Sequence, residues 1–165
     1  MTEKLATLKS QHLLLLIPTL LLVFLAAFVV LQTHKQADGD YVEWEKSGGV
    51  AGLVEFLKID SDGSWTFARR VGDRSTSRSG RLTKDQLIQI RQLISNSDFL
   101  NLEEDVFKPK AGNFDYFSYR LKTIIDGKTK QVTWVDSWAS SVPLPEKLLN
   151  LQKQIELFIA GELVA

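Results

Sequence analysis

The longest uncharged segment of the chain covers residues 13–31 and reads LLLLIPTLLLVFLAAFVVL. As a helix it would be about 28 Å long, close to the ~30 Å thickness of the hydrocarbon core of a bilayer. A cleaved signal peptide is the alternative, but its apolar run is usually roughly 7 to 15 residues long, and no small-x-small cleavage site follows this segment. We therefore expect residues 13–31 to form an uncleaved transmembrane helix, which leaves enough of the 165 residues for one folded domain.

The charges on either side of this segment predict its orientation. Lys4 and Lys9 precede it, and the chain after it begins with acidic residues, namely Asp38, Asp40, Glu43 and Glu45. By the positive-inside rule, residues 1–12 are expected in the cytoplasm. Residues 32–40 would be a polar tether, and residues 41–165 an extracytoplasmic domain, periplasmic or at the cell surface. The chain has no cysteine, so the domain must be stable without disulfides.

The first part of this domain has the composition of three β-strands. Residues 41–45, 53–59 and 64–70 are predicted strands, and Asp60-Ser-Asp-Gly63 supplies the residues of a hairpin turn between the last two. Residues 69–81 hold five arginines and one acidic residue among Ser, Thr and Gly, without apolar periodicity. We expect that segment to be a mobile loop.

Helical and hairpin signals follow. Thr83 and Gln86 have the spacing of a capping box, ahead of a helical apolar stripe that ends near residues 95–97. Residues 115–125 and 128–136 are predicted strands, joined by an Asp-Gly dipeptide typical of a type I′ turn. A second amphipathic helix is expected over residues 144–160, with Gly161 as its stop. The predicted fold is α+β in the order βββαββα, an antiparallel sheet of about five strands covered by two amphipathic helices.

The residue types for most catalytic chemistry are missing from the predicted domain. Both histidines, His12 and His34, flank the apolar segment, so the domain has neither a Ser-His nor a Cys-His pair, nor the usual zinc ligands. Acidic residues at 103–105 are expected on a solvated surface, and a hydrolase that uses only carboxylates remains an alternative. Residues 41–165 contain 17 basic and 17 acidic side chains, which does not favour nucleic-acid binding. We expect no enzyme activity, no cofactor and no metal.

The most unusual stretch of the domain is a glycine block between the first two predicted strands. It consists of Ser47, Gly48, Gly49, Val50, Ala51 and Gly52. The block matches neither a phosphate-binding loop nor a dinucleotide fingerprint. Two interpretations remain: its backbone lies close to a protein partner, or its glycines are needed only to fold a bulged hairpin. Trp134 and Trp138 each fit either a core or an exposed position, and the core is the default assignment for both.

Residues 47–63, SGGVAGLVEFLKIDSDG, resemble the opening of emfourin-type domains, which begin Ser-Gly-Gly-aromatic-Ala-Gly and continue as a strand to an Asp-Gly turn. The likeness extends over most of residues 41–160. It includes an Asp-x-Phe-x-Tyr strand at Asp115, Phe117 and Tyr119, then Asp136, and a Val-Pro pair at residues 142–143 before the last helix. Val50 stands where the family has an aromatic residue.

The resemblance implies a noncatalytic domain that inhibits a thermolysin-like zinc metallopeptidase, with residues 47–52 as the partner-binding site. Membrane attachment through residues 13–31 is outside the resemblance. An accessory or adaptor subunit of a membrane protein complex is the alternative function.

Overall fold

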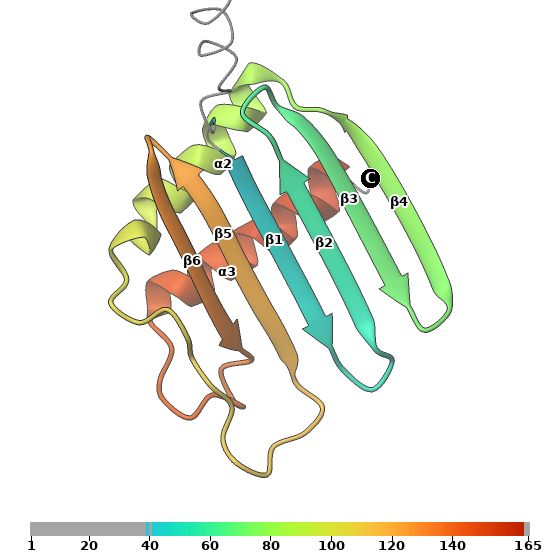
Figure 1. The fold of residues 1–165 in the computed structure, drawn as a ribbon, viewed down its shortest axis with the longest axis vertical. Helices are drawn as coiled ribbons and strands as arrows, with labels where there is room; N and C mark the ends of the chain where they lie inside the picture. The colour runs from blue at the N-terminus through green and yellow to red at the C-terminus, as the bar shows by residue number, and fades with distance from the viewer. Residues whose placement is uncertain (1–38, 40, 164–165) are drawn as a thin grey trace, which may run out of the picture. The chain divides into compact units, whose positions relative to one another are not determined.

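The computed structural model describes residue 39 and residues 41–163, which belong to one compact unit (Figure 1). The expected cytoplasmic residues 1–12, the transmembrane helix 13–31 and nearly all of the tether lie outside the described residues. Within the part of the chain that is described, no helix has both the length and the apolar character needed to cross a bilayer.

The described residues form one antiparallel sheet of six strands, with two helices on one of its faces (Figure 1). The spatial order of the strands is β4-β3-β2-β1-β5-β6. In chain order the elements are β1 (Tyr41–Gly48), β2 (Leu53–Ile59), β3 (Ser64–Val71), β4 (Arg74–Arg81), α2 (Lys84–Asn96), η1 (Phe99–Asn101), β5 (Phe117–Ile125), β6 (Lys128–Val135), α3 (Glu146–Phe158) and η2 (Ile159–Leu163). The predicted α+β class, the antiparallel sheet and the two helices are confirmed, and the number of strands is six instead of five.

The additional strand comes from the arginine-rich segment, and the prediction that residues 69–81 form a mobile loop is wrong. Residues 69–71 complete β3, and β4 pairs with β3 along its whole length, from Ser64 opposite Arg81 to Val71 opposite Arg74. Gly72 and Asp73 form the two-residue turn, with Gly72 at φ +55°. Glycine at the first central position is typical of a type II′ hairpin, whose twist matches that of the strands. Backbone pairing, and not an apolar stripe, therefore forms this strand.

Two predicted turns are present in the structure. Asp126 and Gly127 join β5 to β6, and both have positive φ, +50° and +74°, as a type I′ turn requires. In the turn between β2 and β3, Asp62 accepts hydrogen bonds from the hydroxyl of Ser64 at 2.6 Å and from its backbone N–H at 2.9 Å. These two bonds, reinforced by Arg81, lower the pKa of the Asp62 carboxyl to about 2.

The predicted capping box is also present. The backbone N–H of Gln86 donates to the Thr83 hydroxyl at 3.2 Å, and the Thr83 N–H donates to the Gln86 side chain at 2.8 Å. The predicted stop at Gly161 is wrong, because α3 continues through it as the π-helical turn η2. Ile159 and Leu163 are buried in η2, so their packing against the core favours a further turn.

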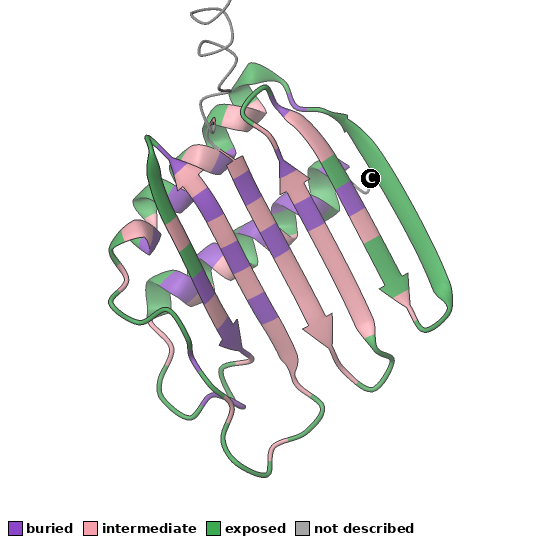
Figure 2. Ribbon diagram, viewed as in Figure 1, coloured by how far each residue is buried: buried purple, intermediate pink, exposed green. Residues whose placement is uncertain are grey.

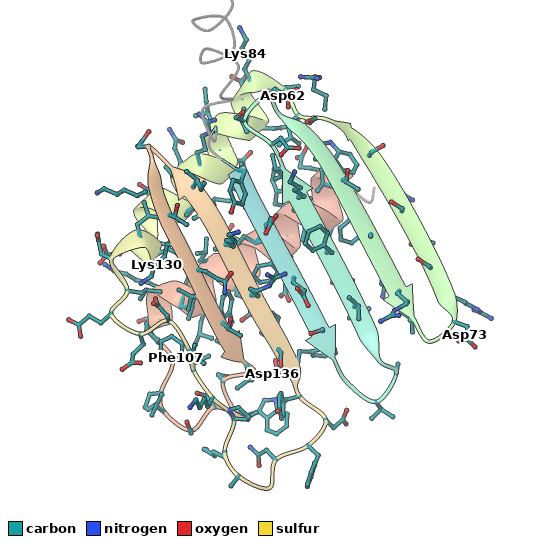
Figure 3. All side chains as sticks on the ribbon, in the orientation of Figure 1. Asp62, Asp73, Lys84, Phe107, Lys130 and Asp136 are labelled. Carbon is teal, nitrogen blue, oxygen red and sulfur yellow. The ribbon has the colours of Figure 1, made fainter. Side chains whose placement is uncertain are left out.

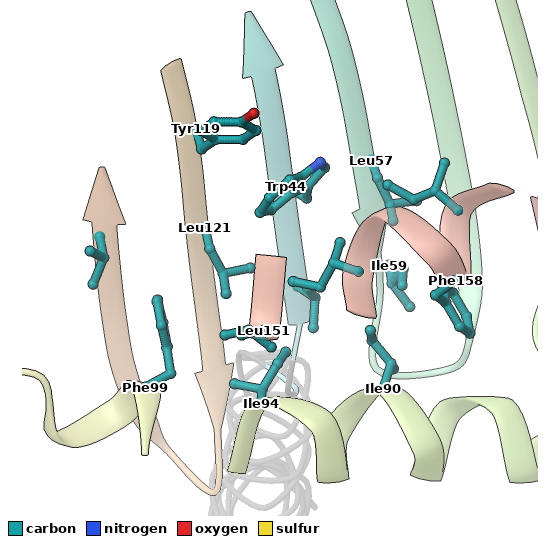
Figure 4. Packing of buried hydrophobic residues seen from close by; sticks show 14 of the residues in the cluster. Trp44, Leu57, Ile59, Ile90, Ile94, Phe99, Tyr119, Leu121, Leu151 and Phe158 are labelled. Carbon is teal, nitrogen blue, oxygen red and sulfur yellow. The ribbon is translucent and has the colours of Figure 1, made fainter. Parts of the chain in front are cut away.

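The core lies between the sheet and the helices (Figure 4). Within the core, Trp44, Tyr119 and Trp134 pack together with ring centroids 5.6–5.7 Å apart. The indole N–H of Trp134 donates to Gln152 of α3 at 2.8 Å. Both helices contribute buried apolar side chains, among them Ile90, Ile94, Leu148, Leu151, Ile155 and Phe158. The default assignment of Trp134 to the core is thus confirmed, whereas that of Trp138 is wrong, because its side chain is exposed.

Candidate functional site

Three loops meet at the end of the sheet where β1 ends, and we call residues 49–52, 108–116 and 136–142 the loop end (Figure 1). Backbone hydrogen bonds join them. The N–H of Gly49 donates to the carbonyl of Tyr116 at 3.2 Å, the N–H of Lys110 to that of Ala139 at 2.8 Å, and the N–H of Ser141 to that of Lys108 at 2.8 Å. The loop end is therefore one connected surface built from segments that are far apart in the sequence.

The first two glycines of the block are packed against the chain itself. Gly48 has φ +127°, and a Cβ there would lie 2.3 Å from the carbonyl oxygen of Tyr116. Gly49 has φ +70°, and a Cβ there would lie 2.9 Å from the ring of Phe117. Neither space nor backbone conformation suits a side chain at these positions. For this pair of glycines the structure favours the folding interpretation.

The remaining residues of the block form the exposed tip of the hairpin. The N–H of Gly52 donates to the carbonyl of Gly49 at 2.9 Å and closes the turn. The side chain of Val50 is 89% exposed, and a Cβ on Gly52 would meet no atom within 4 Å. Of the predicted partner-binding residues, Val50, Ala51 and Gly52 are thus accessible at the tip, while Ser47 pairs with Val54 and Ser118 within the sheet.

The other two loops carry exposed apolar side chains as well. Phe114 is 82% exposed, Trp138 57% and Val142 48%. Large apolar side chains exposed on loops that are joined to one another are suited to bind a protein, because burying them against a partner removes apolar area from water. Sequence reasoning missed Phe114 and Trp138. Their neighbours gave a signal, since both aromatic residues stand among Gly, Asn, Asp and Ser, in AGNFD and DSWAS.

Asp136 fixes the base of the loop end (Figure 3). Its carboxylate accepts hydrogen bonds from the backbone N–H of Phe117 at 2.8 Å and from the hydroxyl of Tyr119 at 2.9 Å. Burial and the adjacent Asp136 carboxylate raise the pKa of Tyr119, so its hydroxyl stays protonated and keeps donating. The loops therefore leave the sheet from a hydrogen-bonded base, which limits their conformations.

A hollow of about 340 Å³ lies near the end of α3, lined by residues of β1, β2, β3, α3 and η2. Its four charged side chains form two ion pairs, Lys46 with Glu156 at 2.8 Å and Arg69 with Glu55 at 3.2 Å. Both carboxylates are thus used in ion pairs, an arrangement typical of a structural role. Over residue 39 and residues 41–163, no group of three or more His, Cys, Asp or Glu side chains is placed to hold a metal ion.

The acidic residues at 103–105 lie on the surface, as predicted. All three are exposed, and Asp105 pairs with Lys130 of β6 at 2.6 Å. This segment runs beside β6 and so belongs to the edge of the sheet.

Neither a scan against protein-family models nor a search of curated proteins finds a match for this chain. The functional assignment therefore rests on the geometry of the loop end and on the resemblance noted from the sequence.

Proposed function

We propose that residues 41–163 form a noncatalytic domain that binds a protein partner through the loop end, and that residues 13–31 anchor it to a membrane. The observation that carries this proposal is the exposure of Val50, Phe114 and Trp138 on three loops that are hydrogen-bonded to one another. Because the loops are already joined, little conformational entropy is lost when a partner binds them.

The path of the chain supports this use of the loop end. The chain enters the sheet at Tyr41, at the start of β1, and the glycine hairpin lies at the other end of the same strand (Figure 1). Eight residues of extended strand span about 26 Å. An anchor formed by residues 13–31, with residues 1–12 in the cytoplasm, would therefore be connected to the domain at the end away from the loops.

We further propose a thermolysin-like zinc metallopeptidase as the partner. The resemblance to emfourin-type domains points to this class, and the shape of the hairpin tip fits it. Val50, Ala51 and Gly52 have little side-chain entropy to lose, and they project from a turn that is closed by its own hydrogen bond. A small, rigid tip of this kind can fill a peptidase cleft and exclude the substrate without any chemistry of its own.

Titration of the cognate thermolysin-like peptidase with the full chain in detergent tests this proposal. We expect loss of peptidase activity at about one chain per enzyme. Val50→Asp should raise the concentration needed by roughly tenfold or more, because a carboxylate would have to be desolvated in the cleft.

Ser61→Asp is the matched control, since it adds the same charge in an exposed turn at the other end of the sheet. It should inhibit like the unmodified chain. Full peptidase activity in the presence of excess chain would reject the inhibitor assignment and favour an adaptor subunit of a membrane complex.

A further inference from the structure

The two edges of the sheet differ in how far other parts of the chain cover them. At β6, the N–H of Thr133 donates to the carbonyl of Asp105 and the N–H of Phe107 donates to the carbonyl of Thr133, each at 2.9 Å. Residues 105–107 thus cover part of that edge. At the opposite edge, all eight residues of β4 are exposed (Figure 2).

The backbone of β4 is suited to accept a further strand. It pairs with β3 in an unbroken register and contains no proline. In a two-residue hairpin the residues next to the turn, Val71 and Arg74, form a hydrogen-bonded pair, and such pairs then alternate along an antiparallel ladder. The hydrogen bond from the N–H of Leu82 to the carbonyl of Gly63, at 2.9 Å, fits this alternation, because it makes residues 63 and 82 a hydrogen-bonded pair as well. The outward N–H and C=O groups of β4 therefore belong to Ser75, Ser77, Ser79 and Arg81.

The charge of this edge selects the kind of strand that fits. The hairpin of β3 and β4 holds five arginines, at positions 69, 70, 74, 78 and 81, against one acidic residue, Asp73. Two of the five pair with carboxylates outside the hairpin, Arg69 with Glu55 at 3.2 Å and Arg81 with Asp62 at 3.0 Å. Arg74 and Arg78 share a face of the sheet with Phe67, since Arg78 is opposite Phe67 in the register. Pairing of two copies of β4 would bring two sets of arginines together, which is unfavourable. An acidic side chain opposite Arg74 would be attracted.

We propose that β4 binds an extended acidic segment of a partner protein, which adds to the sheet as a seventh strand. The backbone of Ser75, Ser77 and Ser79 forms the new ladder. A glutamate or aspartate of the segment lies beside Arg74 and supplies the selectivity, as side chains do in other cases of strand addition. This surface is distinct from the loop end, and the inference does not depend on the function proposed for the loops.

A labelled peptide, Thr-Glu-Val-Glu-Val-Glu-Thr, is a direct probe for the full chain held in nanodiscs of neutral lipid. Fluorescence anisotropy should show saturable binding, and the same peptide with lysine in place of glutamate should bind at least roughly tenfold more weakly. Arg74→Gln should weaken binding of the acidic peptide by roughly threefold, as expected for the loss of one exposed ion pair.

Ser77→Pro separates strand addition from simple charge attraction. The N–H of Ser77 faces outward, so proline removes a donor to the new strand and leaves the pairing with β3 in place. We expect this variant to lose peptide binding and to melt near the unmodified chain, while Ser77→Ala keeps both properties. If Ser77→Pro does not fold, two N-methylated peptides take the place of this variant. One is methylated on the backbone nitrogens of its glutamates and the other on those of its remaining residues. Only one of these two sets of N–H groups faces β4, so only one of the two peptides should lose binding.

Several results would overturn the proposal. The first is that the lysine peptide binds the chain as tightly as the acidic peptide. The second is that the acidic peptide binds the Ser77→Pro variant fully, or that both methylated peptides bind the unmodified chain fully. The third is that the chain forms a dimer which Ser77→Pro dissociates. Preferential binding of anionic phosphatidylglycerol vesicles over the acidic peptide, insensitive to Ser77→Pro, would assign the arginines to a lipid surface instead.

Discussion

Replacing Gly48 by alanine is expected to destabilise the domain by about 2–6 kcal/mol, the sum of ~1–3 kcal/mol for a φ of +127° and ~1–3 kcal/mol for overpacking. The added Cβ would lie 2.3 Å from the Tyr116 carbonyl oxygen, so β1 and β5 would have to separate where their pairing begins. Against a total stability of ~5–15 kcal/mol this is a large fraction. Thermal unfolding followed by circular dichroism should show a melting temperature lower by about 10 °C or more.

Gly52→Ala is the matched control for this prediction. Gly52 also has a positive φ, +61°, but no atom lies within 4 Å of the site of its Cβ. It should therefore show only the backbone cost of ~1–2 kcal/mol. If Gly48→Ala melts at the same temperature as Gly52→Ala, the close packing of Gly48 against Tyr116 is incorrect.

Simultaneous truncation of Leu148 and Ile155 to alanine should abolish cooperative unfolding. Both side chains are buried on the face of α3 that packs on the sheet, and each truncation leaves a cavity that costs ~2–5 kcal/mol. The combined cost approaches or exceeds the ~5–15 kcal/mol of a typical domain. Near-ultraviolet circular dichroism should then lose the signal of the packed Trp44, Tyr119 and Trp134.

Leu157→Ala on the same helix provides the comparison, because the Leu157 side chain is 56% exposed. Its effect should be within about 0.5 kcal/mol, as for most surface substitutions. A double variant of Leu148 and Ile155 that still unfolds in one sharp transition would mean that α3 does not close the core.

Most of the fold could be predicted because its signals are local. The capping box of Thr83 and Gln86 involves residues three positions apart, and the Asp126-Gly127 turn depends on two neighbouring dihedral angles. The apolar stripe of α3 is a property of one segment. Each of these features forms from side chains that are already close in the sequence, so the rest of the fold is not needed to recognise it.

Strand β4 was missed because its residues bury nothing. A search for apolar alternation cannot find a strand whose eight side chains are all exposed and which is held by backbone pairing with β3. The turn signal was nevertheless present in Gly72-Asp73, a dipeptide typical of two-residue hairpins. If the Gly72-Asp73 turn signal is given more weight than the absence of apolar alternation, the sequence predicts a strand after the turn and six strands in all.

The glycine block shows what a single sequence leaves open. The partner of Gly48 is the carbonyl of Tyr116, which follows it by 68 positions, and no local pattern predicts that contact. The exposure of Phe114 and Trp138 likewise depends on how three loops meet. The sequence correctly identified the hairpin as unusual, and the fold divides it into a packed pair, Gly48 and Gly49, and an exposed tip.

Photo-crosslinking from single positions in living cells is the most direct test of the claim that the loop end binds a protein partner. A photoreactive amino acid is introduced at Val50 or at Phe114, and at Lys128 as a control, since the hairpin between β5 and β6 lies at the opposite end of the sheet (Figure 1). We predict one discrete protein adduct from both Val50 and Phe114 and none from Lys128. Adducts from Lys128 alone, or none from either loop position in cells that contain the cognate peptidase and the membrane complexes, would contradict the account.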